Sequence, residues 1–157
     1  MGKKPSPNAP CPCGQKVKLK RCCLALINGR PAKTPEALMR SRYVAYLLGR
    51  ATYILETTHP EGPQFRTDRR RWLAQITDFC RATTFVGLEI LATSDEETDP
   101  VVHFRATLTQ DGRDASFCER SLFRRHNGQW KYLGPADQGI GSGGRAATRS
   151  RCPPSAL

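Results

Sequence analysis

Acidic residues are absent from both ends of this 157-residue chain. Residues 1–33 hold eight lysines and arginines and residues 138–157 hold three arginines, yet neither segment contains an aspartate or a glutamate. The formal net charge of +11 comes from these ends, because residues 34–137 hold 14 basic and 14 acidic side chains. Binding to a phosphate backbone needs clustered cations that displace counterions. The neutral middle therefore does not indicate a nucleic-acid binder, and any anionic partner is expected at the ends.

Long hydrophobic runs are also missing. The longest unbroken apolar runs are Leu24–Ile27 and Val44–Leu48, whereas a membrane-spanning helix needs about 20 apolar residues. The N-terminal region also lacks the apolar stretch of a secretory signal peptide. We therefore expect a cytoplasmic protein without a membrane span. Thiols stay reduced in that compartment, so clustered cysteines there favour metal binding over disulfides.

Cysteine is the residue type that the chain does have in excess, with four of its seven cysteines inside the segment CPCGQKVKLKRCC. These four are Cys11, Cys13, Cys22 and Cys23. Two close pairs joined by a short loop can bring four sulfurs onto one tetrahedral zinc ion, and four protein ligands leave no open position for chemistry. The spacing predicts a structural Zn²⁺ site. Three alternatives stay open: iron in the same site, a disulfide pair, and thiols without a metal.

Basic side chains fill the loop between the two cysteine pairs. They are Lys16, Lys18, Lys20 and Arg21, and no acid accompanies them. Positive charge offsets the negative charge of an ion bound by four thiolates. The same side chains suit contact with an acidic protein surface, or with the ribosome and its RNA. The leading functional hypothesis is therefore a zinc-binding adaptor.

Helix signals fill the first half of the neutral middle. Thr34 is placed to cap a helix, and the apolar spacing after it predicts a helix that is weakened at Gly49 and ends before His59. Asp68 opens a second predicted helix that runs through about Cys80.

From Phe85 onward the apolar period changes to two, which is typical of strands. Val86 shares its parity with Leu88, so both are expected on the same face of a sheet. Asp111-Gly112 and Asn127-Gly128 are signals for hairpin turns. Helices followed by an antiparallel meander predict an α+β fold, with the helices covering the apolar face of a curved sheet. A homodimer through the outer face of that sheet is a further possibility.

One residue of the predicted strands is acidic at a position where the alternation predicts an apolar side chain. Glu119 shares its parity with Phe117 and Phe123, so its side chain is expected to face the core or a cavity. It could act there as a general acid or base, or it could be hydrogen-bonded to nearby donors, as buried polar groups usually are. Histidine is scarce, with three in the chain, and none lies near enough to Glu119 in sequence to indicate a catalytic dyad.

Several motifs resemble a known family. CPCG, the lysine-rich spacer and RCC resemble the SEC-C motif, a zinc-binding module known from the SecA translocation ATPase, with the four clustered cysteines at its ligand positions. PEALMRSRYVAY, ERSLF and GQWKY are similar to segments of the YchJ family. The resemblance spans about residues 11–135. It implies a small N-terminal zinc knot in residues 1–33, a nuclear transport factor 2-like cone in residues 34–137, and no particular activity. The composition of residues 138–157 predicts a disordered basic tail.

A cone of this kind implies a pocket between the helices and the sheet. Such folds host isomerases and dehydratases as well as proteins without a ligand, so the fold alone does not decide. The alternative hypothesis is therefore a small-molecule binder or enzyme with Glu119 as its acid or base. The other residues expected to line the pocket are Tyr43, Tyr46, Trp72, Phe104 and Trp130.

Overall fold

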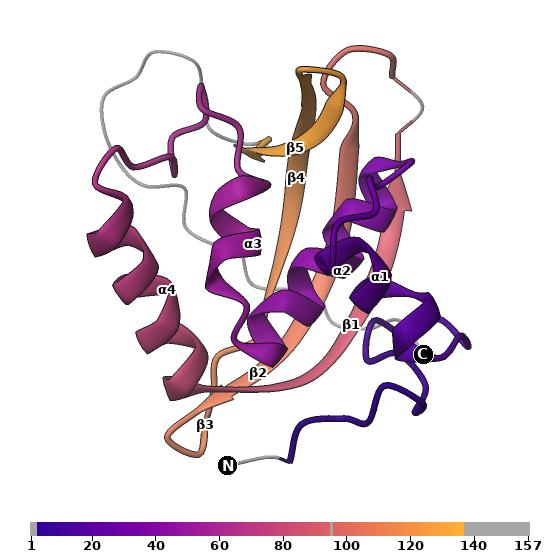
Figure 1. Ribbon diagram of the computed structural model, residues 1–157, viewed down its shortest axis with the longest axis vertical. Helices are drawn as coiled ribbons and strands as arrows, with labels where there is room; N and C mark the ends of the chain where they lie inside the picture. The colour runs from indigo at the N-terminus through magenta and orange to yellow at the C-terminus, as the bar shows by residue number, and fades with distance from the viewer. Residues whose placement is uncertain (1–2, 95, 137–157) are drawn as a thin grey trace.

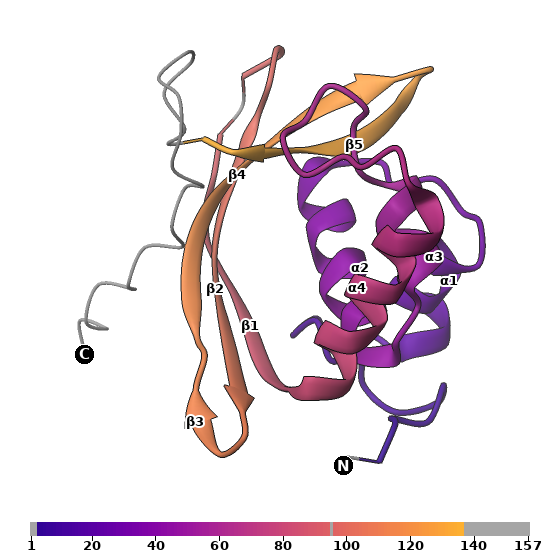
Figure 2. The same cartoon turned by 90° about the vertical axis from the view of Figure 1, so that its left-hand side faces the viewer.

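The computed structural model describes residues 3–94 and 96–136, which form one layer of helices on a curved antiparallel sheet (Figures 1 and 2). This arrangement confirms the predicted α+β class. Figure 2 shows the sheet curving so that β5 (Gln129–Pro135) comes round toward the helices. The predicted tail of residues 138–157, with Cys152, lies outside the described residues.

The helices are the 3-10 helix η1 (Leu19–Arg21), α1 (Cys23–Ile27), α2 (Pro35–Leu48), α3 (Ala51–Glu56) and α4 (Arg69–Ala82). Of these, α2 and α4 begin at the caps that the sequence predicts, Thr34 and Asp68. The Ala37 N–H donates to Thr34 Oγ1 at 3.1 Å, and the Arg71 N–H donates to Asp68 Oδ1 at 3.1 Å. Each acceptor satisfies one of the backbone donors that a helix start leaves free.

The prediction of one helix from Thr34 to His59 is wrong, because Gly49 divides it into α2 and α3. Gly49 adopts a left-handed conformation with a φ of 73°. Its N–H donates to the Tyr46 carbonyl at 3.1 Å, while the Arg50 N–H donates to the Ala45 carbonyl at 2.8 Å. These two bonds form a Schellman motif, which ends a helix at a glycine and turns the chain.

The sheet has the strand order β1-β2-β4-β5, and every pair of neighbours is antiparallel. Its other strands are β1 (Thr83–Thr93), β2 (Val101–Gln110), β4 (Phe117–His126) and the short β3 (Arg113–Asp114), which pairs with β2. Asp111 and Gly112 have φ values of 50° and 71°, and Asn127 and Gly128 have 51° and 80°. Both predicted hairpin turns are therefore confirmed, with the left-handed central residues of type I′.

A bulge in β1 corrects the expectation for Val86. The register with β2 shifts between Phe85 and Gly87, so Val86 leaves the alternation and is 61% exposed. Leu88 remains packed against the core. One extra residue in a strand moves a side chain to the other face, and an alternating pattern does not reveal where it is inserted.

The core consists of two clusters of buried side chains. The larger lies between α2 and the sheet and includes Leu38, Val44 and Phe104. It extends into the cysteine-rich segment, which contributes Leu19 and three of the clustered cysteines. The smaller includes Ile54 of α3 and Ile76 of α4. In the described part of the chain, no helix is both long enough and apolar enough to cross a membrane.

Candidate metal centre and pocket

The four clustered cysteines form a compact group at the N-terminal side of α2. Their sulfur atoms all lie within 4.8 Å of one another. Cys13 Sγ is 3.6 Å from Cys22 Sγ, which is 3.9 Å from Cys23 Sγ. A tetrahedral ion with 2.3 Å bonds to sulfur holds its ligands about 3.8 Å apart. The cluster therefore has the spacing to bind one metal ion.

Backbone contacts fix this arrangement. The Cys11 N–H donates to the Val17 carbonyl at 2.8 Å, which closes the loop between the two cysteine pairs. Gly14, directly after the first pair, turns the chain with a φ of 96°. The second pair is held at the junction of η1 and α1, because α1 begins at Cys23. Arg40 of α2 donates from Nη1 to the Cys13 carbonyl and so ties the loop to the body.

The electrostatics of the cluster favour a bound cation. Hydrogen bonds from the Cys13 and Cys23 thiols lower the pKa of Cys11 to about 2. Burial, with the neighbouring sulfurs, raises the pKa of Cys22 to about 12. The hydrogen bond with Cys11 is the largest of the causes that raise the pKa of Cys23. Without a cation the group therefore resists ionising all four thiols, and a metal ion supplies the positive charge that makes this possible.

The basic side chains of the loop face solvent. Lys16, Lys18, Lys20 and Arg21 are all exposed. None of them takes part in an ion pair within residues 3–94 and 96–136. Their positive charge is therefore available to a partner.

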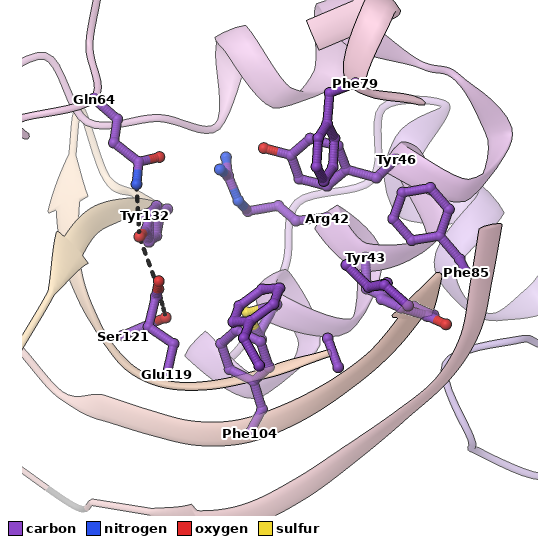
Figure 3. A pocket seen from close by; sticks show the side chains of 14 residues that line it. Arg42, Tyr43, Tyr46, Gln64, Phe79, Phe85, Phe104, Glu119, Ser121 and Tyr132 are labelled. Atoms are coloured by element: carbon purple, nitrogen blue, oxygen red, sulfur yellow. Dashed lines mark hydrogen bonds between the residues drawn. The ribbon is translucent and has the colours of Figure 1, made fainter. Parts of the chain in front are cut away.

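A pocket lies between the helices and the inner face of the sheet (Figure 3). Its volume is about 70 Å³. The structure places four of the six expected residues in its lining: Tyr43, Tyr46, Phe104 and Glu119. Phe79 from α4 and Phe85 from β1 complete an aromatic wall with Tyr46, in which Tyr46 packs edge-on to Phe79 and parallel to Phe85.

The expectation that Trp72 lines this pocket is wrong. Trp72 belongs to the smaller core cluster and packs edge-on against Phe65, with ring centroids 5.4 Å apart. Trp72 and Phe79 both belong to α4, but they pack in different places. Trp72 packs in the cluster that includes Ile54 of α3, and Phe79 faces the pocket, because α4 lies beside α3 (Figure 1) and also contacts β1.

The expectation for Trp130 is wrong as well. Trp130 lines a separate hollow of about 140 Å³, together with Leu38 and Tyr53. Its ring lies against the Arg125 guanidinium, with Cζ 4.4 Å from the ring centroid. Tyr132, two residues further along β5, does reach the pocket. The two-residue period correctly places Trp130 and Tyr132 on the same face of β5. Because the strand is curved, however, the two rings reach different cavities.

Glu119 is half-buried, and its carboxylate is hydrogen-bonded to two hydroxyl groups. Its Oε2 accepts from Tyr132 Oη at 2.8 Å and from Ser121 Oγ at 2.5 Å. Gln64 extends the chain by donating from Nε2 to Tyr132 Oη at 3.3 Å (Figure 3). Burial and the adjacent Glu119 charge raise the pKa of Tyr132 well above 10. The phenol therefore stays protonated and donates to the carboxylate.

The sequence reasoning missed Arg42, which is the most buried cation of the pocket at 4% exposure. Its Nη1 donates to the Ile54 carbonyl at 3.1 Å, to Thr57 Oγ1 at 2.8 Å and to Thr58 Oγ1 at 3.2 Å. Its Cζ lies 4.6 Å from the centroid of the Tyr132 ring. A signal was present in the sequence, because Arg42 stands four residues before Tyr46 on the apolar face of the helix.

The fold and the cysteine cluster together define a SEC-C motif protein with a nuclear transport factor 2-like domain. The family model described as YchJ, middle NTF2-like domain, matches residues 34–135. The chain belongs to the YchJ family, which confirms the resemblance seen in its motifs.

Relatives of similar length support this membership. The chain is 40% identical over 133 residues to the UPF0225 protein SCO1677 of Streptomyces coelicolor, covering 80% of this chain and 94% of that protein. It is 36% identical over 128 residues to the UPF0225 protein VP1145 of Vibrio parahaemolyticus, covering 78% of this chain and 72% of that one.

Two solved structures share the fold. The solution structure of RPA3114, a SEC-C motif containing protein from Rhodopseudomonas palustris, superposes with a TM-score of 0.67 at 35% identity, covering 79% of this chain and 94% of that one. The crystal structure of a SEC-C motif containing protein from Psychrobacter arcticus has a TM-score of 0.66 at 24% identity, covering 80% and 81% of the two chains. At that identity the second comparison supports the fold alone.

Proposed function

We propose that the chain is an adaptor of the cytoplasm, whose N-terminal knot, residues 1–33, binds a structural zinc ion and presents positive charge to an acidic surface. One observation carries the proposal. Four exposed cations without ion-pair partners among the described residues stand on the same short loop as four sulfurs with tetrahedral spacing.

Zinc is the ion that we propose for the knot, because four thiolates suit it and leave no open coordination position. The ion fixes the loop, and the fixed loop holds the side chains of Lys16, Lys18, Lys20 and Arg21 in one region. A preorganised charge cluster loses less freedom on binding than a flexible one. The partner that suits it is anionic, either an acidic protein surface or ribosomal RNA.

The test compares two triple variants that remove the same charge from different places. Lys16→Gln/Lys18→Gln/Lys20→Gln removes charge from the knot, whereas Arg69→Gln/Arg70→Gln/Arg71→Gln removes it from the exposed start of α4. Each variant and the wild type are purified from their own cells at low salt, and bound protein and RNA are quantified with and without nuclease. We expect the knot variant to lose its partner and the α4 variant to keep it.

Salt provides the second measurement. Contacts made by exposed cations weaken steeply as ionic strength rises. We expect the complex to dissociate between about 50 and 200 mM salt. A complex that the knot variant retains, or that is indifferent to salt, would contradict the adaptor proposal. Loss of the partner after nuclease treatment identifies it as RNA, and retention identifies an acidic protein.

A further inference from the structure

The pocket contains a buried cation that forms no ion pair among the residues that the structure describes. Arg42 is 4% exposed, and within residues 3–94 and 96–136 no carboxylate lies within ion-pair distance of it. Burying an unpaired charge is costly, so a charge in this position normally has a counterion or a ligand.

The described residues accept hydrogen bonds from only one nitrogen of the Arg42 guanidinium. The three hydrogen bonds to α3 and the residues after it all come from Nη1, and all of their acceptors are neutral. Among the described residues, no acceptor contacts Nε or Nη2. Figure 3 shows the guanidinium projecting into the pocket, between Gln64 and Tyr132 on one side and Tyr46 on the other. Nε and Nη2 form the fork that binds a carboxylate through two parallel hydrogen bonds.

Glu119 offers the complementary group in the same pocket. Both of its protein donors, Tyr132 and Ser121, contact Oε2. In the described part of the chain no donor contacts Oε1. The pocket therefore combines an unused set of donors on Arg42 with an unused acceptor on Glu119. A ligand that matches both must carry an anionic oxygen for the first and a hydrogen-bond donor for the second.

The walls and the volume restrict the rest of the ligand. Tyr46, Phe85 and Phe104 present aromatic surfaces, which favour a flat apolar body. A volume of about 70 Å³ corresponds to roughly five water positions at 10–15 Å³ each. The ligand is therefore small, of the order of a single ring or a short unsaturated chain.

We propose that the pocket binds a small planar hydroxy acid, with its carboxylate on Nε and Nη2 of Arg42, its hydroxyl donating to Glu119 Oε1 and its apolar body against Tyr46 and Phe85. This site is separate from the cysteine knot and does not depend on the adaptor proposal. The knot variant with Lys16, Lys18 and Lys20 changed to Gln is expected to bind the acid unchanged.

The probes are 3- and 4-hydroxybenzoate, with benzoate and phenol as partial matches, titrated into the full chain near pH 7 and followed by calorimetry and by amide chemical shifts. We expect at least one hydroxybenzoate to bind about tenfold more tightly than either partial match, with shifts at Tyr46 and Tyr132. No binding of any acid at millimolar concentration, or equal binding of phenol and the hydroxybenzoates, would overturn the proposal.

Variants of Arg42 and Glu119 should change the affinity for benzoate in opposite directions. Benzoate carries the carboxylate of the proposed ligand without its hydroxyl. Arg42→Lys keeps the charge but loses the fork, so we expect at least a tenfold loss of affinity. Glu119→Gln removes the negative charge beside the acid, so we expect a gain. A merely structural role of the two residues would not give opposite signs, and equal losses in both variants would count against the ligand class.

Two further variants keep the result interpretable if Arg42→Lys folds poorly. Ala106→Leu leaves both charged groups in place and fills the pocket from β2, since Ala106 lines it at 3% exposure, so we expect binding to be abolished. Arg125→Lys is the matched control, because Arg125 also lies against an aromatic ring, that of Trp130, but outside the pocket. It should bind like the wild type. Binding unaffected by Ala106→Leu would place the ligand elsewhere and refute the proposal.

Discussion

The contribution of a single hydrogen bond to the free energy of unfolding depends on the charge of the acceptor and the burial of the donor. Tyr132 donates to a carboxylate and is 5% exposed. Tyr53 Oη donates at 2.7 Å to the neutral hydroxyl of Ser41, which itself donates to the Leu38 carbonyl. Bonds to charged groups contribute about 1.5–3 kcal/mol, against about 1 kcal/mol for neutral pairs.

The two tyrosines therefore give a matched pair of variants. We expect Tyr132→Phe to lower the free energy of unfolding by about 2 kcal/mol and Tyr53→Phe by about 1 kcal/mol. Urea unfolding at pH 7 measures both. A larger loss in Tyr53→Phe would show that the bond to Glu119 is not what makes Tyr132 important.

An ion pair between β4 and the loop before β2 makes stability depend on pH. Arg124 donates to Asp99 from Nε at 2.7 Å and from Nη2 at 2.5 Å, and these bonds lower the pKa of Asp99 below its ordinary 3.8. A carboxyl group whose pKa is depressed by folding stabilises the fold above its unfolded value and loses that contribution as the pH falls through its folded value.

We expect Asp99→Asn to cost about 0.5–1 kcal/mol at pH 7, because the pair is partly exposed and screened. Asn tolerates the left-handed backbone of position 99, where φ is 53°, so the substitution isolates the charge. The difference from the wild type should shrink as the pH is lowered below 3.8. Glu97→Gln, at an exposed position, is the control. A loss that stays constant down to pH 2 would exclude the ion pair as its cause.

At the scale of elements, the loop after α3 connects the helices to the last strand. The His59 N–H donates to the Tyr132 carbonyl at 2.8 Å, and the Tyr132 N–H donates to the Thr57 carbonyl at 2.7 Å. This pairing holds the hydroxyl acceptors of Arg42 beside the ring of Tyr132. The loop therefore sets the geometry of the pocket although it contributes only Gln64 to the lining.

Gly62 allows this close approach. A Cβ at that position would lie 2.2 Å from the Leu133 carbonyl oxygen, so the loop would have to move away from β5. We expect Gly62→Ala to destabilise the fold by about 1–3 kcal/mol, as overpacking does. Gly87→Ala is the control, because nothing lies within 4 Å of its added Cβ. Thermal unfolding of both variants distinguishes them, and equal midpoints would show that the loop is free to shift.

At the scale of the whole molecule, the cysteine cluster is continuous with the hydrophobic core of the domain. Cys11, Cys13 and Cys23 belong to the same buried cluster as Leu38 of α2 and Phe104 of β2. A change in the knot should therefore reach the helix that carries Arg42.

We expect the purified chain to contain one zinc per molecule under reducing conditions, and a strong chelator to lower its thermal midpoint by on the order of 5 °C. Amide exchange should rise in α1 and at the start of α2. Cys22→Ser should lose the metal, whereas Cys80→Ser, outside the cluster, should retain it. A chain without stoichiometric metal, or one whose N-terminal segment keeps its exchange protection in chelator, would contradict the metal centre.

Local signals in the sequence determined most of the elements. The caps at Thr34 and Asp68 and the two hairpin turns depend on neighbouring residues alone, so they were predictable. The bulge at Val86 was not, because it leaves the composition of the strand unchanged. The sequence predicted only a weakened helix at Gly49, because a glycine inside an apolar helical pattern can either continue the helix or end it.

The sequence by itself determined the cysteine cluster, the charge around it and the class of fold, because these follow from spacing, composition and period. Only the tertiary structure decided which side chains share the pocket. In the structure Tyr132 contacts Glu119 and Gln64 contacts Tyr132, whereas Trp72 and Trp130 lie outside the pocket. These positions follow from the curvature of the sheet and the placement of α4, which depend on the packing of the whole chain. Only the structure shows that, among the described residues, Ile54, Thr57 and Thr58 accept from Nη1 of Arg42 and none accepts from Nε or Nη2.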